Sequence, residues 1–235
     1  MNGGENGTGF RLAYVPGVTP AKWVNIWAER KPEVPLTLVA TTAAEVVPLL
    51  REGGADAGFV RLPIDRDGLS VIPLYLETTV VVVPKDHAAA ALDEVTIADL
   101  SGEEVLQPLD DTIEWTTLPG EPAFTRPPTT AEAIELVAAG TGVLLVPQSL
   151  ARLHHRKDLT YRPVPDAPQS QIALAWPTEA TTDLVDDFIG IVRGRTVNST
   201  RGRTAPEKPA ERKPRKPAQS RATPSGRTKK TRRPR

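Results

Sequence analysis

Apolar residues recur along this chain at the spacings of short strands and amphipathic helices. Apolar runs of strand length lie at residues 10–15, 36–40 and 55–61. Between the first two runs, Trp23, Ile26 and Trp27 fall on one helical face, and Pro32 ends that helix. A second helical stretch covers residues 42–52. This alternation of strand and helix predicts an α/β fold whose first strands are parallel.

The stretch from 129 to 153 gives the clearest helix signal. Thr129 and Glu132 have the spacing of a capping box, and an apolar helical stripe follows them. Gly140 and Gly142 end this helix. Residues 143–146 then have the pattern of a buried strand, and a second short helix follows. A last amphipathic helix is expected at 181–193, and its buried side would comprise Leu184, Val185, Phe188, Ile189 and Val192.

Threonines at the expected helix starts indicate an anion-binding edge. Thr19 precedes a proline at the first helical position, and Thr42 has capping-box spacing to Glu45. Both follow parallel strands, so their helices begin at the carboxyl edge of the sheet, where ligands bind in α/β folds. Free N–H groups at a helix N-terminus favour a small carboxylate or another oxyanion. The alternative is that these threonines only cap their helices.

The order and spacing of these elements resemble the effector-binding domain of LysR-type transcriptional regulators. The resemblance is carried by the segment 129–153, by the turn at 16–20 after the first strand, and by the run at 55–61. It implies an α/β, two-lobed, periplasmic-binding-protein-like (type 2) domain with mixed, mainly parallel sheets.

The resemblance also sets the expected boundaries of the domain. Residues 1–9 are expected to be a flexible N-terminus. Lobe I is expected at about 10–84 and 168–195, and lobe II at about 85–167, with two extended segments crossing between them.

In the family, an effector binds in the cleft between the lobes, against the loops after the first two strands and facing segments of the second lobe. The corresponding residues here are Pro16, Gly17, Val18, Thr19, Thr41, Thr42, Arg61, Gln107, Thr129 and Thr130. The implied partners are a small anionic effector and a second copy of the chain, because the family dimerises through this domain. Trp23 and Trp27 are expected in the core or in that dimer contact.

An irregular segment at 108–128 carries Trp115 and Arg126. The tryptophan would give an apolar cleft wall and the arginine a fork for a carboxylate. The alternative is a surface loop with a half-buried tryptophan.

Catalytic and metal chemistry find little support in the sequence. There is no cysteine, so thiolate metal sites and disulfides are excluded within these 235 residues. Gly140-Thr141-Gly142 lies after a helix and before a strand, the reverse of a dinucleotide loop. His154 and His155 fit a solvated helix end better than a metal site. We therefore expect no enzyme activity, no catalytic residues, no metal and no cofactor.

The formal charge of zero hides two opposed parts. Residues 196–235 contain fourteen Lys or Arg and two Glu, a charge of +12, which leaves fifteen basic and 27 acidic residues before them. This tail has six prolines and no Leu, Ile, Phe, Tyr or Trp, so it is expected to be disordered. Its basic residues are expected to bind nucleic acid: Arg201, Arg203, Arg212, Lys213, Arg215, Lys216, Arg227, Lys229, Lys230, Arg232, Arg233 and Arg235. The alternatives are a solubility tail and an intramolecular clamp on the acidic body.

Regulators of this family normally begin with a helix-turn-helix, whereas here nine residues precede the first strand. We therefore expect a free-standing sensor that affects transcription through its tail or a partner regulator, unless the chain start is an artefact of gene prediction. Neither a signal peptide nor an apolar run of membrane length is evident, which leads to the expectation of a cytoplasmic protein without membrane contact. The alternatives are a small-molecule carrier with no DNA role and an enzyme on the same scaffold.

Overall fold

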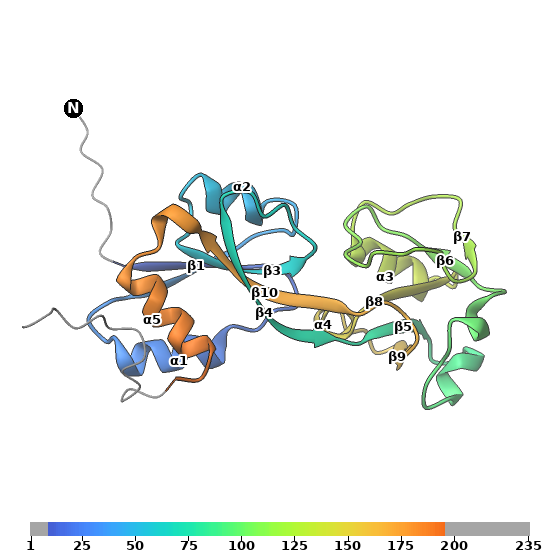
Figure 1. Cartoon of the computed structure of the whole chain (residues 1–235). Coiled ribbons are helices and arrows are strands. Elements are labelled where there is room, and N and C mark those ends of the chain that lie inside the picture. The colour runs from blue at the N-terminus through green and yellow to red at the C-terminus, as the bar shows by residue number, and fades with distance from the viewer. Residues whose placement is uncertain (1–8, 196–235) are drawn as a thin grey trace, which may run out of the picture. The chain divides into compact units, whose positions relative to one another are not determined.

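The computed structural model describes residues 9–195, which lie within one compact unit of the chain. The tail at 196–235 and residues 1–8 lie outside the described residues, so the expected disorder and flexibility there stay predictions. The described residues form two five-stranded sheets, each with its own helices (Figure 1). Among these residues, no helix is long and apolar enough to cross a membrane.

The first sheet has the strand order β2-β1-β3-β10-β4. Its strands are β1 (Phe10–Tyr14), β2 (Leu36–Ala40), β3 (Ala57–Leu62), β4 (Leu69–Glu77) and β10 (Ser170–Pro177). Strand β1 is parallel to β2 and β3, as the strand and helix alternation predicts, and β10 is antiparallel to β3 and β4. The helices of this lobe are α1 (Ala21–Arg30), α2 (Val46–Arg51), the 3-10 helix η3 (Thr178–Ala180) and α5 (Asp183–Val192).

The second sheet has the strand order β7-β6-β8-β5-β9. Its strands are β5 (Thr79–Pro84), β6 (Glu104–Leu106), β7 (Glu121–Pro122), β8 (Val143–Pro147) and β9 (Leu159–Pro163). The helices here are α3 (Thr130–Ala138), α4 (Gln148–Leu153) and the 3-10 helices η1 (Ala88–Ala91) and η2 (Ala98–Leu100). Strand β6 is parallel to β7 and β8, and β5 is antiparallel to β8 and β9. The predicted mixed α/β fold is confirmed. The sheets are not mainly parallel as expected, because parallel and antiparallel pairings are equal in number.

Aromatic side chains join the first and last elements of the first lobe. Phe10 of β1 stacks on Trp27 of α1 at 4.7 Å between ring centroids, and Phe188 of α5 lies 5.1 Å from Phe10. Trp23 stacks on Phe59 of β3 at 4.6 Å. Helix α5 therefore packs on the first lobe as its apolar stripe predicts, and both tryptophans of α1 contact the core of their own chain.

The chain crosses from the first sheet to the second at Thr78, whereas the sequence analysis placed the crossing after Pro84. Strand β4 ends at Glu77, and Thr79 already pairs with Pro147 of the second sheet. All of β5 therefore belongs to the second lobe. The boundary has no sequence signal, because a single residue separates β4 from β5 and no glycine or proline turn lies between them.

The predicted cap of α1 is wrong by one residue. The N-cap of α1 is Pro20, whose carbonyl accepts hydrogen bonds from Trp23 and Val24, and no side chain caps this helix. Thr19 precedes the cap and is exposed. A proline with φ of −76° can hold the N-cap position by its own backbone geometry, so the hydroxyl of Thr19 is not used there.

Candidate functional site

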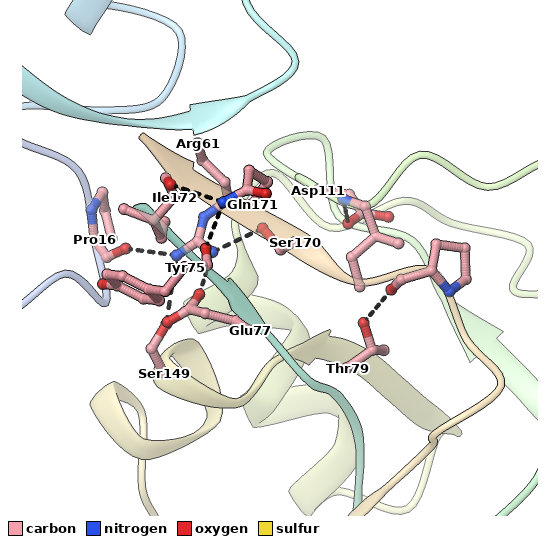
Figure 2. A network of polar contacts seen from close by, with 12 residues as sticks. Pro16, Arg61, Tyr75, Glu77, Thr79, Asp111, Ser149, Ser170, Gln171 and Ile172 are labelled. Carbon is pink, nitrogen blue, oxygen red and sulfur yellow. Dashed lines mark hydrogen bonds and ion pairs between the residues drawn. The ribbon is translucent and has the colours of Figure 1, made fainter. Parts of the chain in front are cut away.

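Arg61 of β3 lies in a buried polar network beside the crossing between the sheets (Figure 2). Its guanidinium forms an ion pair with Glu77, the last residue of β4. The same group donates to the hydroxyl of Ser170 at 2.9 Å and to the backbone carbonyl of Pro16 at 3.2 Å. A charge this deeply buried needs such partners, because an unpaired ion in the interior is strongly destabilising.

Ser149 connects this network to the second lobe. This residue lies in the first turn of α4, and its hydroxyl donates to Glu77 Oε2 at 3.0 Å. Arg61 Nη2 donates to the same hydroxyl at 3.4 Å. The loop that carries Pro16, the strands β3 and β4, and a helix of the second lobe thus meet around one guanidinium. We call Pro16, Arg61, Glu77, Ser149 and Ser170 the Arg61 network.

Tyr75 lies close to the Arg61 network in Figure 2. Burial raises the pKa of the Tyr75 hydroxyl above its ordinary value, and the nearby Glu77 carboxylate raises it further, while Arg61 opposes both effects. The tyrosine is therefore neutral in the ordinary pH range and adds no charge to the network.

Gly17 lets the loop after β1 approach α4 closely. Its φ is +84°, a left-handed conformation that glycine adopts without steric cost. A Cβ at this position would lie 2.4 Å from Ser149 Oγ, closer than real Cβ contacts allow. Of the predicted effector-binding residues, Gly17 therefore lies directly against the second lobe, whereas Pro16 is linked to it through Arg61.

The threonines predicted at the second loop are already paired within the chain. The backbone N–H of Thr41 donates to the carbonyl of Tyr14 at 3.1 Å. The hydroxyl of Thr42 donates to Glu45 Oε2 at 2.9 Å and accepts from the Glu45 backbone N–H at 3.2 Å. This is the capping-box arrangement, although the regular helix begins one residue after Glu45.

The predicted residues of the second lobe are also paired within the chain, the two threonines with carboxylates and Gln107 with an arginine. Thr129 caps α3, as predicted, by accepting from the backbone N–H of Glu132 at 3.2 Å. The buried hydroxyl of Thr130 donates to Asp110 Oδ1 at 2.8 Å. Gln107 uses its backbone carbonyl to accept from Arg126 Nε at 2.9 Å. The hydrogen bonds among the described residues do not join this group to Thr41, Thr42 or the Arg61 network.

The polar side chains of the segment between β6 and α3 form hydrogen bonds within that part of the chain. The Arg126 guanidinium donates to the carbonyls of Gln107 and Pro108, so two of its nitrogens are already paired within the chain. The indole of Trp115 donates to Asp111 Oδ2 at 3.2 Å and packs on the core of the second lobe. Burial raises the pKa of the Asp111 carboxyl above its ordinary value, against smaller opposing effects from its hydrogen bonds to Ile113 and Trp115.

Sequence reasoning identified Arg61 but missed the residues that hold it. Glu77, Ser149 and Ser170 lie 16, 88 and 109 positions away from Arg61 in the sequence. No motif links residues at such separations. One signal was present, because a glutamate at the end of a largely apolar strand calls for a cationic partner.

Among residues 9–195, no cluster of three or more His, Asp or Glu side chains has the arrangement of a metal site. The polar groups described above pair carboxylates with hydroxyls, amides and a guanidinium. Such an arrangement can hold a ligand or join two lobes.

Comparison with known proteins agrees with this fold. The model of the LysR substrate binding domain family matches residues 10–196. A probable hydrogen peroxide-inducible genes activator of Mycobacterium avium is 31% identical over 153 residues, which are 60% of this chain and 49% of the relative. The Hca operon transcriptional activator HcaR of Escherichia coli K12 is 25% identical over 203 residues, covering 78% of this chain and 68% of the relative. The chain thus spans about half the length of the mycobacterial relative.

Solved structures give the same result. The effector binding domain of BenM with its effector benzoate superposes with a TM-score of 0.66 at 22% identity, covering 79% of this chain and 90% of that one. The oxidised form of OxyR gives a TM-score of 0.64 at 21% identity, with coverage of 78% and 92%. These likenesses confirm the predicted two-lobed fold. The relatives named here regulate transcription, in agreement with the prediction that the domain is not an enzyme.

Proposed function

The chain belongs to the LysR substrate binding domain family, and on that premise we propose that it senses a small molecule and takes part in regulating transcription. The proposed effector is a small carboxylate or another anion that contacts the loops at Pro16 to Thr19 and at Thr41 and Thr42. As a regulator of chromosomal genes, the protein would act in the cytoplasm, as a homodimer.

One observation carries the sensing proposal. The carbonyl of Pro16, in the loop after β1, accepts a hydrogen bond from Arg61, which also contacts Glu77 and Ser149. A ligand that displaces this loop therefore acts on hydrogen bonds that reach α4 of the second lobe. Binding then favours one arrangement of the lobes by as much as the ligand's affinity differs between arrangements.

The preference for an anion is supported by the carboxylates of the chain that the predicted residues contact. Thr42 donates to the Glu45 carboxylate, Thr129 to that of Glu132 at 3.3 Å, and Thr130 to that of Asp110. Arg61 is paired with Glu77. Each of these donors has the hydrogen-bonding chemistry that a carboxylate needs, so an effector carboxylate would compete with the chain's own acidic groups.

Thiol oxidation does not contribute to sensing by these residues. Relatives include activators of hydrogen peroxide-inducible genes, and a solved relative is described as oxidised. The 235 residues here contain no cysteine and a single methionine, Met1. They cannot form a disulfide or a sulfenic acid, so a reversible ligand is the mode of sensing that the chain supports.

Calorimetric titration with a panel of mono- and dicarboxylates tests this proposal. Thr19→Val should weaken binding about tenfold or more, because a hydrogen bond to a charged group contributes roughly 1.5–3 kcal/mol. This variant is informative because Thr19 caps no helix, so the loss of a cap cannot explain the effect. Thr42→Val should weaken binding similarly, and Thr37→Val on β2 is the matched control. Equal affinities in the wild type, Thr19→Val and Thr42→Val would leave only the structural roles of these residues.

A further inference from the structure

A separate hollow of about 480 Å³ lies in the second lobe and contains no residue of the Arg61 network. Its walls come from β5, β9, α3, α4 and the loop after α4. The apolar part is formed by Val82, Ile134, Ala151 and Leu159, each at most 6% exposed. A volume of this size suits a small molecule, since ligand pockets commonly measure roughly 300–1,000 Å³.

The polar lining of this hollow is basic. It includes Lys85, His154, His155, Arg156 and Arg162, and none of the described residues that line it is acidic. This contrasts with residues 1–195 as a whole, which carry 27 acidic and fifteen basic residues. The charges of the lining are those of Lys85, Arg156 and Arg162, and a lining with basic and no acidic side chains among the described residues favours an anionic ligand.

Two of these basic side chains are already paired within the chain. Arg156 pairs with Glu135 and Asp158, which lie outside the lining. Arg162 donates to the carbonyls of Ala90 and Leu92 and to the hydroxyl of Thr160. Lys85 is exposed and is absent from the ion pairs and side-chain hydrogen bonds of the described residues, and its charge interacts with the Asp158 carboxylate only at longer range. Lys85, His154 and His155 are therefore the groups left to bind a ligand.

We propose that this hollow is a second small-molecule site, for a carboxylate carried on an aromatic or branched apolar group. The apolar group would lie over the small apolar surface that Val82, Ile134 and Leu159 leave exposed, and the carboxylate would accept hydrogen bonds from Lys85 and the histidines. The site adjoins the last turn of α4, whereas Ser149 of the Arg61 network lies in the first turn of the same helix. An occupant would thus contact a helix that also contacts the loop after β1.

The histidines make this site directly observable. The chain has three histidines, of which His154 and His155 line the hollow and His87 does not. In the full chain labelled with ¹⁵N-histidine, phenylacetate should shift the imidazole signals of His154 and His155 saturably, and leave those of His87 unchanged. Single His→Gln variants assign the signals. The uncharged isostere phenylacetamide and inorganic phosphate should each bind at least about tenfold more weakly than phenylacetate. The first lacks the negative charge, and the second lacks the apolar group.

Two variants separate this site from the cleft. Lys85→Met should weaken phenylacetate binding about tenfold, whereas Lys157→Met, which removes the same charge from the same lobe outside the lining, should not. Thr19→Val should leave the histidine shifts intact, so a failure of the cleft proposal would not affect this result. Absent or equal shifts of all three histidines, or unchanged binding in Lys85→Met, would overturn the proposal.

Discussion

Arg61 and Glu77 form an ion pair whose side chains are only 2% and 10% exposed. Desolvation of two charges is expensive, so such a pair stabilises little by itself, while the loss of one partner leaves an uncompensated ion. The hydrogen bonds that Arg61 donates to Ser170 and Pro16 offset part of this desolvation cost. The pair therefore fixes where β3, β4 and the loop after β1 lie relative to one another.

Glu77→Ala should lower the free energy of unfolding by about 3–5 kcal/mol, because it leaves the Arg61 guanidinium buried without a counter-ion. Arg61→Met combined with Glu77→Met should be milder than Glu77→Ala, since no charge remains. Asp65→Asn is the control: it breaks the exposed Arg51–Asp65 pair and should change the free energy of unfolding much less, because solvent screens exposed ion pairs. Urea unfolding monitored by circular dichroism measures all of these. A small loss in Glu77→Ala, comparable to that in Asp65→Asn, would mean that water reaches the Arg61 network.

Gly17→Ala should destabilise the domain more than Gly53→Ala. Both glycines have positive φ, of +84° and +71°, so both substitutions carry a similar backbone cost. At Gly53 an added Cβ meets nothing within 4 Å, whereas at Gly17 it meets Ser149. The steric term should add roughly 1–3 kcal/mol at Gly17 alone. Thermal unfolding of the two variants measures the difference, and equal losses would contradict the close packing of this loop on α4.

Local features of the fold were predictable, and the boundary between the lobes was not. The cap at Thr129 and the buried stripe of α5 depend on spacings of three or four residues, which the sequence displays directly. The crossing at Thr78 depends on which sheet β5 pairs with, and an apolar strand such as Thr79–Pro84 fits either sheet. Pairing over long sequence separations decides that choice.

The same reasoning applies to the candidate site. Arg61 was predicted because the resemblance places it at the end of the third strand. Its partners Glu77, Ser149 and Ser170 come from three different elements, so only the fold brings them together. The threonines were predicted for their chemistry. In the structure Thr129 caps α3, Thr42 pairs with Glu45 in the turn before α2, and their role in binding a ligand stays a prediction.

Asp111 should make stability depend on pH with an unusual sign. Burial raises the pKa of this carboxyl in the folded state, so the folded state holds the proton more tightly than the unfolded state does. The stabilisation is fully present below the ordinary pKa, near 3.9, and is lost as the pH rises through the raised value. Relative to Asp111→Asn, the wild type should therefore lose free energy of unfolding as the pH rises above about 4 and through the raised pKa.

Asp99 provides a control of opposite sign. Hydrogen bonds from Thr96 lower the pKa of its carboxyl. The wild type should therefore gain stability relative to Asp99→Asn as the pH rises toward and through 3.9. Urea unfolding at a series of pH values measures both differences. If the wild type gained stability with rising pH relative to both Asp111→Asn and Asp99→Asn, burial would not determine the pKa of Asp111.

The basic tail should carry whatever affinity this chain has for nucleic acid. The charge of +12 on residues 196–235 opposes −12 on residues 1–195, so the body should repel a phosphate backbone and the tail should attract it. If the tail neutralises about six to ten phosphates, affinity should fall roughly 10³- to 10⁵-fold between 50 and 200 mM salt, because binding releases counter-ions. Little discrimination between sequences is expected, since phosphate contacts carry no sequence information directly.

Fluorescence anisotropy with duplex DNA, comparing residues 1–195 with the full chain across a salt series, measures the affinity and its salt dependence. A full-chain variant with the tail's Lys and Arg changed to Gln controls for length. Undiminished binding by residues 1–195, or binding by the full chain that ignores salt, would exclude the tail as the contact.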